Sequence, residues 1–115
     1  MMRYEIVNPS DKCFISADDV RLAKVACAML GYGMYGLKDA DDQLVMGILE
    51  PLDEAVGLKD EAALVDFIDR NKPELAKVFR SFEYEGEQTS LNDIGGLAAR
   101  FAAALEAKEE DNAHV

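Results

Sequence analysis

Histidine, cysteine and basic residues are scarce in this chain of 115 residues. The only histidine, His114, stands next to the last residue in a polar segment, so neither a Ser-His-Asp triad nor a histidine-rich metal site has the groups it needs. Cys13 and Cys27 are separated by thirteen residues and have apolar neighbours, which favours buried reduced thiols over a disulfide or half of a zinc site. We therefore expect no catalytic residues of the usual hydrolase types, no metal and no cofactor.

Long hydrophobic runs and excess positive charge are also missing. Acidic residues outnumber basic ones by 23 to 12, which gives a net charge of −11 and a pI near 4.4. Because phosphates and anionic lipids repel such a chain, we expect no direct binding to nucleic acid or to a membrane. No run approaches the roughly 18 apolar residues of a membrane span, and the first residues lack the regions of a signal peptide. We therefore expect neither a membrane span nor a signal peptide.

The order of hydrophobic patterns predicts an α+β fold with a small antiparallel sheet. Two β-prone runs, 3–7 and 12–16, flank turn-forming residues and predict an N-terminal β-hairpin. The apolar run within 43–49 lacks alternation and predicts a third strand beside the hairpin, covered on both faces, with a bulge at Gly47. Residues 31–42 are expected to form an exposed connection.

About four helices are predicted to cover this sheet, over residues 17–30, 60–70, 73–82 and 90–105. Ser16 and Asp19 resemble a capping box at the start of the first helix, and Gly31 is its expected end. In the second helix, the expected buried stripe is Leu64, Val65 and Ile68. In the third, Leu75, Val78, Phe79 and Phe82 follow helical spacing. Half of the residues are apolar, which predicts a single packed domain over 1–105, followed by a flexible acidic tail over 106–115.

Two short motifs resemble known ligand sites but stand in the wrong context. Gly31, Gly33 and Gly36 match the dinucleotide-binding spacing, but they follow a predicted helix, whereas the fingerprint joins a strand to the N-terminus of a helix. We expect a loop in which one or more of these glycines have positive φ. The run from Asp39 to Glu50 partly matches a calcium-binding loop, but leucine stands where that loop requires glycine. An acidic solvated loop is the favoured interpretation.

Negative charge is concentrated in one part of the chain. Residues 39–69 hold ten acidic residues and one basic residue, a net charge of −9, whereas 70–82 carry a net charge of +3. A solvated face of like charge is one explanation. The other is a negative surface that docks on a basic partner and fills a groove meant for nucleic acid. On this hypothesis, the predicted partner-binding residues are Asp39, Asp41, Asp42, Asp53, Glu54, Glu61, Asp66 and Asp69.

Small residues define one face of the last predicted helix. Gly95 and Gly96 each cost roughly 1 kcal/mol relative to alanine inside a helix, so a compensating contact is expected. Gly95, Ala99 and Ala103 recur every four residues, which allows another backbone to approach closely. Packing within the domain is favoured, and contact with a partner or with a second subunit, which would give a homodimer, is the alternative.

Two segments resemble a known group of proteins. Residues 4–11 (Tyr-Glu-Ile-Val-Asn-Pro-Ser-Asp) lead into an alanine-rich helix that ends in Leu-Gly, and residues 89–96 (Thr-Ser-Leu-Asn-Asp-Ile-Gly-Gly) lead into another. This combination resembles short proteins encoded by tailed bacteriophages and prophages. The group includes inhibitors of host defence such as anti-CRISPR proteins, and also recombination, regulatory and virion-assembly accessories. The resemblance implies a phage protein acting in the cytoplasm of a bacterial host, and it supplies no catalytic residues.

Three functions are consistent with these features. The preferred one is a non-enzymatic, anti-CRISPR-like inhibitor that occludes a basic nucleic-acid-binding surface of a host complex. The second is a homo-oligomeric accessory of phage assembly or regulation, with the small face of the last helix as the subunit contact. The third, a small carboxylate-dependent enzyme, is disfavoured because no nucleophile, base or ligand cluster stands out.

Overall fold

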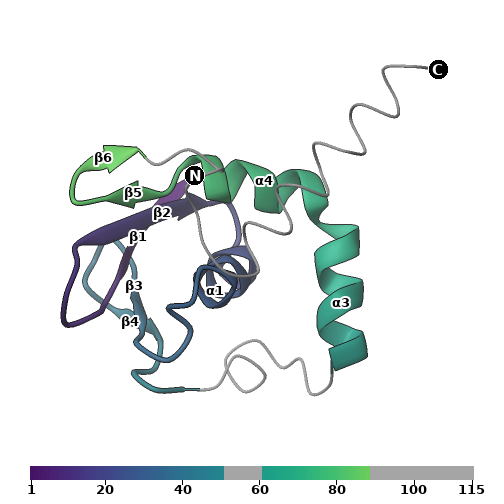
Figure 1. The fold of residues 1–115 in the computed structure, drawn as a ribbon, viewed down its shortest axis with the longest axis horizontal. Coiled ribbons are helices and arrows are strands. Elements are labelled where there is room, and N and C mark those ends of the chain that lie inside the picture. Colours follow the sequence, from purple (N-terminus) through teal and green to yellow (C-terminus); the bar gives the residue numbers. More distant parts are fainter. Residues whose placement is uncertain (51–60, 89–115) are drawn as a thin grey trace.

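The computed structural model describes residues 1–50 and 61–88, which form an α+β fold with a six-stranded antiparallel sheet and three helices (Figure 1). The strands are β1 (Met2–Ile6), β2 (Cys13–Ala17), β3 (Leu37–Lys38), β4 (Leu44–Met46), β5 (Glu83–Tyr84) and β6 (Glu87–Gln88). The helices are α1 (Val20–Met29), α3 (Glu61–Arg70) and α4 (Lys72–Arg80). The strand order is β4-β3-β1-β2-β5-β6. The predicted α+β class is therefore confirmed.

The predicted N-terminal hairpin is present as β1 and β2. The side chain of Asn8 shapes its turn, because Oδ1 accepts the backbone N–H groups of Ser10 at 2.9 Å and Asp11 at 2.7 Å. Tyr4 pairs with Ile15, and both face the core. Since side chains alternate along a strand, the residues on either side of Tyr4 in β1 and of Ile15 in β2 point to the opposite face of the sheet.

The third strand differs from the prediction in position and in burial. β3 lies between β4 and the hairpin, because fully buried Leu37 takes the place beside β1. β4 is consequently an edge strand, and Leu44, Ile48 and Leu49 are 49%, 60% and 63% exposed. The strand predicted within 43–49 therefore does not lie beside the hairpin, and it is not covered on both faces. Both of these predictions are wrong.

The predicted bulge is also displaced. Leu37 pairs with Met46, and Lys38 pairs with Leu44, so β4 has one additional residue, Val45, opposite β3. Gly47 lies after the strand, in a turn where its N–H donates to Oε2 of Glu50. The bulge therefore falls at Val45, and the glycine serves the turn.

Helix α1 begins later than predicted. Asp19 is its N-cap and accepts the N–H of Arg21 at 2.7 Å. Ser16 belongs to β2, so the predicted capping box is wrong. The predicted end is confirmed, since Gly31 follows the helix with φ +96°.

Helices α3 and α4 follow the prediction in extent, but not in every buried residue. Leu75, Val78, Phe79 and Phe82 are buried as predicted. In α3, the partly buried residues are Leu64, Phe67 and Ile68, while Val65 is 51% exposed. The prediction that Val65 belongs to the buried stripe is wrong, because Leu64, Phe67 and Ile68 pack against the core and Val65 lies on the exposed side of α3.

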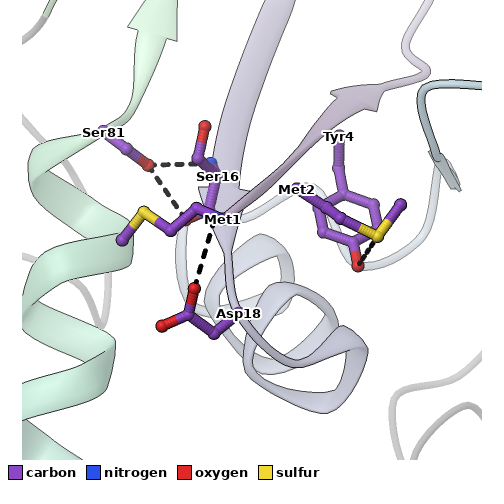
Figure 2. A network of polar contacts seen from close by, with 6 residues as sticks. All are labelled: Met1, Met2, Tyr4, Ser16, Asp18 and Ser81. Carbon is purple, nitrogen blue, oxygen red and sulfur yellow. Dashed lines mark hydrogen bonds and ion pairs between the residues drawn. The ribbon is translucent and has the colours of Figure 1, made fainter.

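The sheet and the helices share one hydrophobic core. α1 and α4 both pack against β2, and α3 contacts α4. The hydroxyl of Ser81, at the end of α4, accepts the backbone N–H of Ser16 at 2.8 Å and so ties this helix to β2 (Figure 2). Each of the described helices is too short or too polar to cross a membrane.

A second hairpin, β5–β6, was not predicted for the polar segment that contains it. Glu85 and Gly86 form its two-residue turn with φ of 52° and 85°. Positive φ at both central residues is the backbone conformation of the commonest tight hairpin turns. The N–H of Glu85 donates to the carbonyl of Lys12 at 2.8 Å, which fixes this hairpin beside β2. The predicted fourth helix, its small face (Gly95, Ala99, Ala103), the domain end at residue 105 and the acidic tail lie outside the described residues.

Candidate functional site

The acidic residues predicted to bind a partner lie in two separate groups. Asp39, Asp41 and Asp42 form the loop between β3 and β4, whereas Glu61, Asp66 and Asp69 belong to α3. Figure 1 shows the β3–β4 hairpin and α3 on opposite sides of α1. Asp53 and Glu54 lie outside the described residues. The structure thus does not bring the two described groups together.

Within the β3–β4 loop, Asp39 has a structural role. Its Oδ1 accepts the N–H of Asp41 at 2.9 Å and that of Gln43 at 3.0 Å. Its backbone N–H donates to the carbonyl of Gln43 at 3.0 Å. These bonds fold the loop back on itself and leave Asp41 and Asp42 exposed. Asp42 has φ +61°, which aspartate and asparagine tolerate better than most residues.

Beside this loop, the outer face of the sheet is hollowed. We call this site the acidic hollow; its volume is about 240 Å³, and its lining residues are Arg3, Glu5, Phe14, Asp39, Ala40 and Asp42. Arg3, Glu5 and Phe14 alternate along β1 and β2 with residues of the core, so they point away from the helices. The β3–β4 loop adds the wall that carries Asp39 and Asp42.

One cation already occupies the border of the acidic hollow. The guanidinium of Arg3 lies over the ring of Phe14, with Cζ 3.9 Å from its centroid. The same group contacts Oε2 of Glu83 through Nε at 3.2 Å and through an NH2 nitrogen at 3.1 Å. Arg3 is therefore directed to β5, and the carboxylates of Glu5, Asp39 and Asp42, which line the hollow, form no ion pair with another residue in the described ranges.

The size and charge of the acidic hollow indicate what it can bind. Small-molecule pockets usually measure roughly 300–1,000 Å³, so about 240 Å³ suits one side chain of a partner better than a whole metabolite. Three carboxylates and one guanidinium favour a lysine or arginine there. In the described ranges, no group of three or more histidine, cysteine or acidic residues is arranged to hold a metal.

The acidic residues of α3 are in a different electrostatic situation. Asp66 forms an ion pair with Arg70 at 2.9 Å, and Asp69 forms one with Lys72 at 3.2 Å. Because Asp66 and Asp69 each have a cation of the same chain beside them, these two carboxylates present less negative potential to a partner than those of the loop do. Exposed pairs of this kind contribute little to stability.

The glycine motif forms a loop, as predicted. It joins the end of α1 to β3, and Gly31 and Gly36 have φ of +96° and +140°. A Cβ at Gly36 would lie 3.2 Å from Cγ1 of Ile48. The motif thus has neither the order nor the helix N-terminus of a dinucleotide site.

The two cysteines are free and buried, which confirms that prediction for them. Burial raises the pKa of Cys27 to about 12. Burial also raises the pKa of Cys13, whose thiol lies 3.8 Å from the hydroxyl oxygen of Tyr32. Both thiols are therefore protonated at neutral pH and poor nucleophiles.

Comparison with protein-family models, with curated proteins and with solved structures finds no match to this chain.

Besides Ala40 in the loop, the lining residues of the acidic hollow that were not predicted are Arg3, Glu5 and Phe14. Alternation along the predicted hairpin would have placed all three on one face of the sheet. Their proximity to the loop depends on the pairing of β3 with β1.

Proposed function

We propose that this chain is a small acidic binding protein that occludes a basic, nucleic-acid-binding surface of a bacterial defence complex, as anti-CRISPR proteins do. The observation that carries the proposal is the acidic hollow, in which carboxylates from β1 and from the β3–β4 loop surround a space of about 240 Å³. The phage resemblance supplies the biological context. The partner is a host protein with a basic surface, such as a component of a CRISPR-Cas complex.

Binding would begin with long-range attraction. The net charge of −11 steers the chain toward a positive groove, and this effect weakens as salt screens charges beyond roughly 8 Å at physiological ionic strength. At contact, exposed Asp41 and Asp42 meet lysine or arginine side chains, and one of these enters the acidic hollow. The groove is then covered and closed to nucleic acid.

The test compares two variants that change net charge equally. Asp41→Asn/Asp42→Asn removes two exposed charges from the loop, and asparagine retains both the shape and the tolerance of positive φ. Asp66→Asn/Asp69→Asn removes two charges that are already paired within α3. We expect the loop variant to weaken binding about tenfold at low salt and to flatten its salt dependence, and the α3 variant to have a smaller effect.

The measurement has a cellular part and a purified part. Plasmid interference is scored in bacterial strains that carry different CRISPR-Cas types and express the chain or a variant. The dissociation constant for the inhibited complex is then measured at two salt concentrations. Undiminished interference in every strain would contradict the anti-CRISPR role, and equal effects of the two variants would contradict recognition through the loop. An obligate homo-oligomer by light scattering, with no host partner, would favour the assembly or regulatory role.

A further inference from the structure

The two edges of the described sheet differ in chemistry. β6 forms one edge and follows the exposed Glu85, with Glu87 exposed in the strand itself. Charged residues of this kind protect an edge from pairing with other chains. β4 forms the other edge, and all three of its residues, Leu44 to Met46, are apolar. One edge is thus protected by charge, and the other lacks that protection within the strand.

The exposed apolar surface continues beyond β4. Leu44, Ile48 and Leu49 are each about half exposed or more, while buried Met46 anchors the strand to the core. The backbone turns immediately after the strand, since Glu50 accepts the N–H of Gly47 at 2.6 Å. The edge is therefore short, apolar in its centre and fixed at its end.

Carboxylates stand at both ends of this edge. Asp41 and Asp42 precede β4, and Glu50 follows it. An antiparallel pairing of β4 with its own copy, centred on Val45, would place Asp41 and Asp42 of each copy at the end that holds Glu50 of the other. Like charges would then gather at both ends and oppose self-association. A strand with basic ends would instead be attracted.

We infer that the edge of β4 is a docking site for an extended segment of the partner, which adds to the sheet as a further strand. The segment carries apolar side chains at alternate positions, to cover Leu44 and its neighbours, and arginine or lysine at both ends. Backbone hydrogen bonds supply affinity in this mode of recognition, and alternate side chains supply specificity. The inference rests on the proposed function, because it names the chemistry of the partner that the acidic chain binds.

The first experiment uses the full chain and the synthetic peptide Arg-Val-Thr-Val-Thr-Val-Arg, with Glu-Val-Thr-Val-Thr-Val-Glu as the charge-reversed control. Amide hydrogen exchange is measured residue by residue, with and without peptide. We expect the basic peptide to slow exchange in β4 at least tenfold, and the acidic peptide to leave it unchanged. Protection of the outer β4 amides in the free chain, at a concentration where the chain is monomeric, would overturn the inference, because another part of the chain would then cover the edge. So would protection that appears only as the chain dimerises.

The second experiment places a charge on the edge. The Leu44→Lys side chain would repel the basic ends of the peptide and would no longer offer its apolar residues a contact. Val65→Lys makes a similar change at an equally exposed position of α3. We expect Leu44→Lys to weaken peptide binding about tenfold and Val65→Lys to have no effect. Equal binding by both variants would overturn the inference. If the loop variant Asp41→Asn/Asp42→Asn still loses the host complex while Leu44→Lys retains it, the docking site fails and the proposed function stands.

Discussion

A single hydroxyl connects the end of α4 to the central strand β2, and its removal has a calculable effect. β5 pairs with β2 only at Cys13 and Phe14, so the backbone of Ser16 has no strand partner on that side. The hydroxyl of Ser81 takes the place of that partner (Figure 2). It accepts the N–H of Ser16 at 2.8 Å and donates to the carbonyl of Val78 at 2.5 Å. We predict that Ser81→Ala destabilises the protein measurably.

The magnitude follows from the groups left without partners. A typical hydrogen bond contributes about 1 kcal/mol net, and a buried donor without an acceptor costs about 1–3 kcal/mol. Ser16 and Ser81 are both half-buried, so water replaces part of the lost contact. The expected loss in the free energy of unfolding is about 1 to 2 kcal/mol. In urea, this loss lowers the unfolding midpoint by roughly 0.5 to 1 M.

The assay is urea unfolding combined with amide hydrogen exchange. Ser10→Ala is the control, because it also removes a serine hydroxyl, but from an exposed turn. There, the backbone N–H of Ser10, and not its hydroxyl, donates to Asn8. We expect the Ser16 amide to exchange faster in Ser81→Ala and at the normal rate in Ser10→Ala. Unchanged stability together with unchanged protection of Ser16 would refute the reasoning.

Three further predictions concern backbone strain, a buried thiol and a helix cap. Gly36→Ala should lower the melting temperature and cost about 1–3 kcal/mol, because φ is +140° and the new Cβ would lie 3.2 Å from Ile48. Burial raises the pKa of Cys27 from 9.0 to about 12, so the thiol's contribution to stability is complete below pH 9 and lost as pH rises toward 12. Urea unfolding should show this loss, at up to about 1.4 kcal/mol per pH unit, with a flatter profile for Cys27→Ala. Asp19→Ala should cost about 1 kcal/mol by the same assay through loss of the N-cap, whereas the exposed Asp18→Ala should change stability by less than about 0.5 kcal/mol.

The parts of the fold that the sequence predicts are those with a local pattern. The first hairpin follows from two β-prone runs around Asn8, whose side chain does fold the turn. Helix α4 follows from the spacing of Leu75, Val78 and Phe79, which are all buried. In these segments, local preference and tertiary packing agree.

The missed parts depend on contacts between distant segments. β3 has two residues, too few for any period, and fully buried Leu37 is placed by its pairing with β1. In α3, helical spacing alone accepts either Val65 or Phe67 as a buried residue, and packing against the core decides for Phe67, whose ring lies beside Arg21 of α1. The hairpin β5–β6 has a local cause in the turn at Gly86, but its strands are polar and lack the hydrophobic alternation that marks most strands.

The candidate site shows the same division between local and distant effects. A count of charge along the sequence places a boundary between residues 69 and 70, yet the ion pairs Asp66–Arg70 and Asp69–Lys72 cross that boundary. The acidic segment therefore contains carboxylates whose charge is largely balanced by the basic segment after it. Conversely, Glu5 belongs to a stretch of nearly neutral composition, but pairing of β1 with β3 brings it to the same hollow as Asp42. Among the predicted partner-binding residues whose side chains the structure describes, Asp66 and Asp69 on α3 are paired with cations, whereas those of the β3–β4 loop form no ion pair with another described residue. The loop therefore presents more of its negative charge to a partner than α3 does.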